Sequence, residues 1–283
     1  MIIETDLGHD PDDFFAICYL VAAGVKVDAI CITPGDLDQI AICRLLCDEL
    51  GLDIPIGVSK ISEKYSSGSI HHALLKQYKR ELHAKPDGMG HEIIKSVIKP
   101  DAEVFVIGPP SNLGKFLAEN NVSIKKLVMQ GGFLGYHLHD YRGVRLEKFE
   151  GKTWMPTFNM NGDRPGTLAI MKANIEERRF CGKNVCHSVV CTSEILEKME
   201  LPKSRAAELF FDGLSVLFGK YGDKKFHDPV AAVCNLHPEV GRWVKGKVQK
   251  IESGWGTLLD DNGDYVLADL DRDAFWQHIY RLD

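Results

Sequence analysis

The feature that most constrains the fold of this chain is the alternation of short Val- and Ile-rich runs with longer amphipathic segments. The runs predict strands at residues 2–5, 27–33, 54–58, 103–108, 125–130 and 185–191. The amphipathic segments predict helices at residues 12–23, 37–51, 90–98, 111–120, 163–173, 203–219 and 229–236. Short apolar strands separated by helices are typical of a mainly parallel sheet that is buried on both faces. We therefore expect an α/β fold with an open, mainly parallel sheet and helices on both faces.

No feature of the sequence divides the chain into domains. No Pro-, Gly- or Ser-rich linker, change of composition or internal repeat interrupts its 283 residues, and 45% of them are hydrophobic, which is enough for a large core. We expect a single domain over residues 1–283. Two long connections, residues 60–89 and 131–157, lack a clear strand pattern. Connections of this length in a compact domain are typical of lids or binding loops.

Composition argues against several classes of partner. A net charge of −6 and the lack of a basic stripe argue against nucleic acid. The longest apolar stretch, from Phe14 to Val25, is too short to span a bilayer, so we expect no membrane partner. No secretory signal pattern precedes the first strand, and we expect a cytoplasmic location. The eight cysteines lack the paired spacing of structural zinc sites, so we expect reduced core cysteines.

Four aspartates within eight residues follow the first predicted strand: Asp6, Asp10, Asp12 and Asp13. Neighbouring carboxylates repel one another unless a cation lies between them, and oxygen ligands without Cys or His suit Ca²⁺ or Mg²⁺. The carboxyl ends of strands in open α/β sheets are also where ligands bind. Alternatively, Asp12 or Asp13 caps the next helix and the other aspartates are solvated. Because capping requires one carboxylate rather than four, we favour a metal site.

A second candidate segment pairs a histidine with an aspartate near the end of the chain. His227 and Asp228 immediately precede Pro229 and an apolar helix. Asp228 could simply be an N-cap, with proline at the first helical position. His227, however, adds a group that can give up a proton near neutral pH. Together with the aspartate cluster, this pair indicates a metal-assisted hydrolase with a general acid.

Five short segments form a specific series along the chain. They are the Asp-rich turn at residues 6–13, Val-Ile-Gly-Pro-Pro-Ser-Asn-Leu at 106–113, Val-Met-Gln-Gly-Gly at 128–132, Phe-Asn-Met at 158–160, and His-Asp-Pro at 227–229. In this order they resemble the signature segments of the inosine–uridine-preferring nucleoside hydrolases. The resemblance runs from residue 2 to about residue 236. It implies the nucleoside hydrolase fold and Ca²⁺-assisted hydrolysis of a ribonucleoside, in nucleoside salvage, to free base and ribose. It also implies a homo-oligomer, which the sequence itself does not show.

The resemblance also implies a set of metal ligands and catalytic groups. Asp6 matches a metal ligand that also serves as general base to the attacking water, and Asp13 matches a bidentate ligand. Ser111 stands where the backbone carbonyl of a Thr binds the metal, a role that is indifferent to the side chain. Asp228 matches the last protein ligand, and His227 matches the acid that protonates the departing base.

The same comparison implies substrate contacts. Asn159 matches a ribose-binding Asn, Met129 belongs to a substrate-contacting segment, and Asp36 stands where the family usually has a ribose-binding Asn. Asp12 matches an aspartate that contacts the ribose. The spacing after the first aspartate is two residues longer than usual, however, so Asp10 is a rival for that role.

The 5′ end of the sugar is where the sequence departs most from the family. Thr157 replaces a Glu, and Gly151 falls near the usual position of an Asn; in the family these two side chains hold the 5′-hydroxyl. The change is compatible with a modified or 5′-phosphorylated nucleoside, or with a catalytically silent relative that binds ribosides. Four basic residues of the nearby loop would suit a phosphate, unless they are simply solvated: Arg142, Arg145, Lys148 and Lys152.

Overall fold

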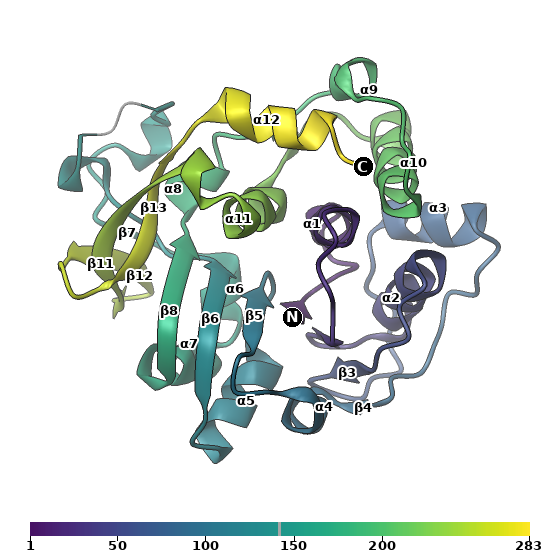
Figure 1. Cartoon of the computed structure of the whole chain (residues 1–283), viewed down its shortest axis with the longest axis horizontal. Helices are drawn as coiled ribbons and strands as arrows, with labels where there is room; N and C mark the ends of the chain where they lie inside the picture. Colours follow the sequence, from purple (N-terminus) through teal and green to yellow (C-terminus); the bar gives the residue numbers. More distant parts are fainter. Residues whose placement is uncertain (141–142) are drawn as a thin grey trace.

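A sheet of eleven strands lies at the centre of the computed structural model, which describes residues 1–140 and 143–283 (Figure 1). The order of its strands is β4-β3-β2-β1-β5-β6-β8-β13-β11-β12-β7. All neighbours from β4 to β13 are parallel, whereas β11, β12 and β7 add antiparallel pairs at one edge. The expected α/β fold with a mainly parallel sheet is therefore confirmed.

Most of the parallel strands are short. The parallel strands are β1 (Ile2–Thr5), β2 (Ala29–Ile32), β3 (Ile56–Val58), β4 (Gly88–Met89), β5 (Glu103–Val106), β6 (Ser123–Gln130), β8 (Asn174–Cys181) and β13 (Asp264–Leu270). The antiparallel edge is formed by β11 (Gly241–Ile251), β12 (Gly254–Leu259) and β7 (Trp154–Met155). A separate two-stranded ribbon pairs β9 (Val190–Cys191) with β10 (Lys224–Lys225).

Helices cover both faces of the sheet (Figure 1). On one side lie α1 (Asp12–Ala22), α2 (Leu37–Leu50), α3 (Ser69–Gln77), α10 (Arg205–Lys220), α11 (His227–Leu236) and α12 (Arg272–Tyr280). On the other side lie α4 (Gly90–Val97), α5 (Ser111–Glu119) and α7 (Arg164–Lys172). Short helices connect these layers: α6 (Phe158–Gly162), α8 (Lys183–Cys186) and α9 (Ile195–Lys198). Among the described residues, none of these helices combines the length and the apolar character needed to cross a membrane.

Two hydrophobic cores result from the alternation of side chains along the strands. Ile3 packs into the core beneath α1, α2, α10 and α11, whereas its neighbour Ile2 packs into the core beneath α4 and α5. Both isoleucines are almost completely buried. All eight cysteines are free and buried, as expected for reduced core residues.

The strand predicted at residues 185–191 is wrong. Most of this segment belongs to α8 and the turn after it, and only Val190 and Cys191 form a short strand. The neighbouring parallel strand is instead β8, which has the charged sequence Asn-Ile-Glu-Glu-Arg-Arg-Phe-Cys. Three of its four charged side chains form ion pairs: Arg178 contacts Asp264 at 3.1 Å, and Arg179 contacts Glu177 at 2.8 Å. The folded sheet thus accommodates charged side chains in this strand. Because of these charges, a search of the sequence for apolar runs does not find it.

A glycine allows the end of β5 to approach the end of β1. A Cβ atom on Gly108 would lie 2.4 Å from the backbone nitrogen of Asp6 and 2.8 Å from its carboxylate oxygen Oδ1. Contacts this short would push the ends of the two strands apart. Asp6 can therefore lie this close to residue 108 only because glycine has no side chain.

We predict that Gly108→Ala lowers the free energy of unfolding by about 1–3 kcal/mol, as is typical of overpacking. Gly219→Ala is the matched control: nothing lies within 4 Å of the added methyl group, so removing a helical glycine from α10 should stabilise the protein by about 0.5–1 kcal/mol. Urea denaturation of both variants measures the difference. Equal effects of the two substitutions would contradict the proposed close approach.

Candidate active site

A pocket of about 360 Å³ opens where β1, β5 and β6 end and where α6 and α11 begin. Its volume lies in the range of small-molecule sites, and its place at the carboxyl ends of parallel strands is where ligands bind in this class of fold. The pocket is lined by Asp6, His9, Asp10, Asp12, Asp13, Ile107, Gln130, Phe158, Asn159, His227 and Asp228.

Buried carboxylates from three segments converge in this pocket. Asp12 and Asp13 lie in the first turn of α1, and Asp228 lies in the first turn of α11, which packs against α1. Oxygen atoms of these three side chains lie within 4.8 Å of one another, and each residue is at most 4% exposed. Asp6, which follows β1, is 5% exposed. The amino termini of two helices thus direct positive dipole ends at the cluster.

The electrostatics of the cluster favour a cation. Burial, with repulsion from Asp12, raises the pKa of Asp6 to about 8. Burial and the neighbouring carboxylates likewise raise the pKa of Asp13 and of Asp228 well above its usual value. Among the described residues, no cationic side chain forms an ion pair with these three aspartates. A donor set made only of carboxylate oxygens fits a hard divalent cation such as Ca²⁺ or Mg²⁺.

Asp12 has different surroundings. Burial alone would raise its pKa, but hydrogen bonding to His227 and the charge of Lys224 outweigh burial and lower it. The carboxylate of Asp12 accepts hydrogen bonds from the backbone N–H of His227 (3.0 Å) and of Asp228 (3.4 Å), and lies 3.3 Å from Lys224 Nζ. Asp12 therefore stays charged and connects α1 to the start of α11.

Asp10 lies at the rim rather than at the centre of the pocket. Its side chain is 48% exposed and lies 2.5 Å from Lys224 Nζ. Of the two candidates for the ribose contact, the structure thus places Asp12 inside the carboxylate cluster and Asp10 at the entrance.

His227 lines the pocket, and one of its ring nitrogens is held by Asp12. Its Nδ1 lies 3.3 Å from Asp12, whereas its buried Nε2 has no hydrogen-bond partner among the described residues. The imidazole also lies against His187, with ring centroids 4.8 Å apart. The imidazole is 23% exposed, and an imidazole that is held at one nitrogen by a carboxylate can transfer a proton from the other nitrogen to a ligand.

Asn159 is oriented by the backbone around it. Its amide nitrogen donates to the carbonyl of Ile107 (3.1 Å) and to Oε1 of Gln130 (2.8 Å). These bonds use the donor side of the amide, so the carbonyl oxygen is the atom available to a ligand hydroxyl.

Four of the expected site residues do not line the pocket. Met129 is completely buried in the core on β6, and the adjacent Gln130 faces the pocket instead. Asp36 is the N-cap of α2, where its N–H donates to Gln39. Thr157 is the N-cap of α6, and its buried hydroxyl has no partner among the described residues. Ser111 is the first residue of α5 and is not among the residues that line the pocket.

Two residues of β1 support the site although the sequence did not single them out. Glu4 accepts hydrogen bonds from the backbone N–H groups of Asn112 and Leu113, both at 2.7 Å, and so holds the start of α5. The hydroxyl of Thr5 donates to the carboxylate of Asp13. The signals for these roles were polar side chains in an otherwise apolar strand and, for Glu4, its place where the family has a leading Asp.

Comparisons with known proteins agree with the fold. The family model described as inosine-uridine preferring nucleoside hydrolase matches residues 1–277. A relative from Aquifex aeolicus (strain VF5), described as an uncharacterized protein, is 25% identical over 274 residues, which cover 92% of this chain and 91% of the relative. A plant nucleoside hydrolase structure has a TM-score of 0.70 at 16% identity and covers 99% of this chain and 96% of its own. An inosine-uridine preferring nucleoside hydrolase from Bacillus anthracis has a TM-score of 0.68 at 17% identity, with coverages of 99% and 98%.

The raised pKa of Asp6 leads to a prediction about stability. Its folded-state pKa of about 8 exceeds the usual 3.8, so between these pH values the folded chain holds a proton that the unfolded chain has lost. Without divalent cations, stability should therefore fall as the pH rises through this window. Added Ca²⁺ should stabilise the protein more at about pH 8 than at about pH 5, because it binds the ionised carboxylates.

Melting temperatures measured in EDTA and in CaCl₂ at both pH values test this expectation. Asp13→Asn should reduce the response to Ca²⁺, whereas Asp53→Asn, at an exposed position, should not. A Ca²⁺ response that is the same at both pH values would contradict it.

Proposed function

We propose that this chain, which belongs to the inosine-uridine preferring nucleoside hydrolase family, hydrolyses the N-glycosidic bond of a ribonucleoside with the assistance of Ca²⁺. In this reaction the oxygen of water bonds to C1′ of the sugar, the C1′–N bond breaks, and the base leaves with a proton. The observation that carries the proposal is the convergence of buried carboxylates and His227 in one pocket. A homo-oligomer, a cytoplasmic location and a role in nucleoside salvage are expectations that rest on the family resemblance.

The carboxylates are suited to holding the ion. Asp6, Asp13 and Asp228, with the backbone carbonyl of Ser111, are the proposed ligands. Oxygen atoms of Asp12, Asp13 and Asp228 form one close group, and Asp6 lies outside it. When bound, Ca²⁺ supplies positive charge that orients the ribose diol and makes water easier to deprotonate.

The protein groups around the sugar have complementary tasks. Cleavage of the C1′–N bond passes through a state in which positive charge develops on the ribose, and nearby carboxylates stabilise that charge. Asp6 is the proposed base that accepts a proton from water, and the carbonyl oxygen of Asn159 is the proposed acceptor for a ribose hydroxyl.

His227 is the proposed acid for the leaving base. Its Nδ1 lies 3.3 Å from Asp12, which orients the ring, and its Nε2 has no hydrogen-bond partner among the described residues, so Nε2 is the nitrogen proposed to donate the proton. A proton transferred from Nε2 to a ring nitrogen of the base converts a poor leaving group into a neutral one.

A second pocket of about 300 Å³ is suited to the base. It shares His9 and Asp10 with the carboxylate pocket and adds the apolar side chains of Ile70, Leu217 and Tyr221. A flat heterocycle can bury its faces against such a surface while its sugar remains at the carboxylates.

A panel of purine and pyrimidine ribonucleosides tests the proposal directly. The purified protein should release free base in CaCl₂, and Asp6→Asn should abolish release because it removes the proposed base and a charged ligand. Asp53→Asn serves as the control. Binding of ribosides without any release of base would instead support a catalytically silent relative.

We predict that His227→Ala lowers kcat for ribonucleosides by about 10²–10⁴-fold, the usual effect of losing a general acid. A nitrophenyl riboside, whose leaving group requires no protonation, should be affected much less. His83→Ala, at an exposed position, should change neither rate. Equal losses for both substrates would show that His227 contacts the sugar or maintains the structure instead.

A further inference from the structure

Three lysines from distant segments meet beside the pocket. They are Lys148 in the long 131–157 connection, Lys183 at the start of α8, and Lys225 on β10. Lys148 Nζ lies 2.9 Å from Nδ1 of His187, and burial together with the positive charges of all three lysines lowers the pKa of this imidazole. Within residues 1–140 and 143–283, none of the three lysines forms an ion pair with a carboxylate.

This arrangement is unfavourable without a counter-charge. Burial and mutual repulsion lower the pKa of Lys148 and of Lys183. The chain contains 40 acidic and 34 basic side chains, so carboxylates are abundant, yet none has been placed here. An anion between the three ammonium groups would remove the repulsion.

His187 completes the cluster. Lys148 Nζ lies 2.9 Å from its Nδ1, and burial together with His227 and Lys148 lowers the pKa of the imidazole. Because an ammonium group can only donate, Nδ1 accepts this hydrogen bond and the ring proton lies on Nε2. The cluster therefore offers three ammonium groups and one imidazole N–H.

The cluster adjoins the pocket at two points. His187 lies against His227, with ring centroids 4.8 Å apart. Lys183 Nζ donates to the carbonyl of Pro156 at 2.7 Å, two residues before the pocket-lining Phe158. Neighbouring residues of a strand point to opposite sides, so Lys224 of β10 contacts Asp10 and Asp12 whereas Lys225 faces the cluster.

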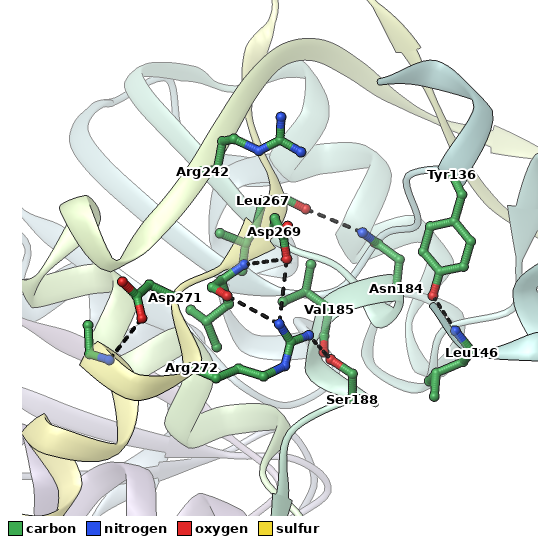
Figure 2. A network of polar contacts seen from close by, with 12 residues as sticks. Tyr136, Leu146, Asn184, Val185, Ser188, Arg242, Leu267, Asp269, Asp271 and Arg272 are labelled. Carbon is green, nitrogen blue, oxygen red and sulfur yellow. Dashed lines mark hydrogen bonds and ion pairs between the residues drawn. The ribbon is translucent and has the colours of Figure 1, made fainter. Parts of the chain in front are cut away.

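The segments that carry the cluster are fixed by buried polar contacts. Figure 2 shows Asn184, next to Lys183, donating to the carbonyl of Leu267 on β13 (3.5 Å). The carboxamide oxygen of Asn184 also accepts from the N–H of Leu134 (3.1 Å), which ties in the start of the 131–157 connection. Arg272 of α12 donates to the hydroxyl of Ser188 (2.6 Å) at the other end of the same segment (Figure 2).

The basic loop expected from the sequence contributes only part of this cluster. Arg145 pairs with Glu150 at 2.7 Å, and Arg142 lies outside the described residues. Lys148 joins the cluster, but its partners Lys183 and Lys225 come from elsewhere in the chain.

We propose that this cluster, Lys148, Lys183, Lys225 and His187, is a phosphate subsite and that the substrate is a ribonucleoside 5′-monophosphate. The inference rests on the proposed function, which places the ribose diol at the carboxylates and the base in the apolar pocket. C5′ is then the remaining substituent of the sugar, and it extends toward residues 156–158 and the lysines. Lysine ammonium groups bind phosphate as point charges, and their number matches the three terminal oxygens of a phosphate monoester.

The reaction leaves the phosphate ester unchanged. The oxygen of water bonds to C1′, the C1′–N bond breaks, and the base leaves with a proton. The products are the free base and ribose 5-phosphate. An enzyme of this kind would supply ribose 5-phosphate to reactions that consume phosphorylated pentoses.

The first experiment compares inosine and uridine with their 5′- and 3′-monophosphates by measuring release of free base. The 5′-monophosphate should have a kcat/KM at least about tenfold higher than the nucleoside at low ionic strength, and added salt should reduce this advantage. A higher kcat/KM for the nucleoside would overturn the inference while leaving the proposed function intact. A preference for the 3′-monophosphate would overturn the assignment to the 5′ end.

The second experiment uses Lys148→Met, Lys183→Met and Lys225→Met. Each should lower the ratio of kcat/KM for the 5′-monophosphate to kcat/KM for the nucleoside by about tenfold to a hundredfold. Lys172→Met is the matched control, because this exposed lysine lies just before the start of β8, whereas Lys183 follows the end of β8. An unchanged ratio in all three variants, with melting temperatures like that of the parent protein, would overturn the subsite.

Calorimetric binding of ribose 5-phosphate and ribose separates the two proposals. Ribose 5-phosphate should bind at least about tenfold more tightly than ribose, and Lys183→Met should remove most of the difference. If no nucleoside or nucleotide is hydrolysed, the proposed function fails, and this measurement still decides the phosphate subsite. Equal affinities for the two sugars would overturn it.

Discussion

Repulsion among buried carboxylates is the constraint on which the rest of this structure depends. Asp6, Asp12, Asp13 and Asp228 meet at the end of β1, where burial makes each negative charge costly and proximity increases the cost. The two helix amino termini reduce this cost but do not remove it. A divalent cation would remove it and would also bind the sugar, so the feature that is least favourable for folding is the one most useful for catalysis.

Asp12 divides the site into parts with different tasks. It is the carboxylate whose partners include both His227 and Lys224, so it stays charged while its neighbours share protons in the absence of metal. Asp12 orients His227, the proposed acid for the leaving base. On the far side of His227 lie His187 and three lysines, where the charge changes from negative to positive. A substrate with a cation-binding diol at one end and a phosphate at the other matches this change from negative to positive charge across the site.

The fold was largely predictable because its first strands are apolar and its helices amphipathic, and the aspartate cluster was evident because its members are neighbours in sequence. The charged β8 was missed since Arg178 finds Asp264 only in the folded sheet. The antiparallel strands after residue 240 were not predicted, because we assigned no strand pattern to that part of the chain. Met129 was expected in the site, but the pleat of β6 turns Gln130 to the pocket instead. Lys148 and Lys183 come close to each other only through tertiary contacts, so no local sequence pattern predicts their proximity.

Calorimetric titration of the metal-free protein with Ca²⁺ in buffers of different ionisation enthalpy tests the central claim most directly. If the buried carboxylates hold protons until a cation arrives, one Ca²⁺ should bind per chain and protons should be released near pH 7. Asp13→Asn should weaken binding and reduce the release. Binding without proton release, or binding that Asp13→Asn leaves unchanged, would contradict the account.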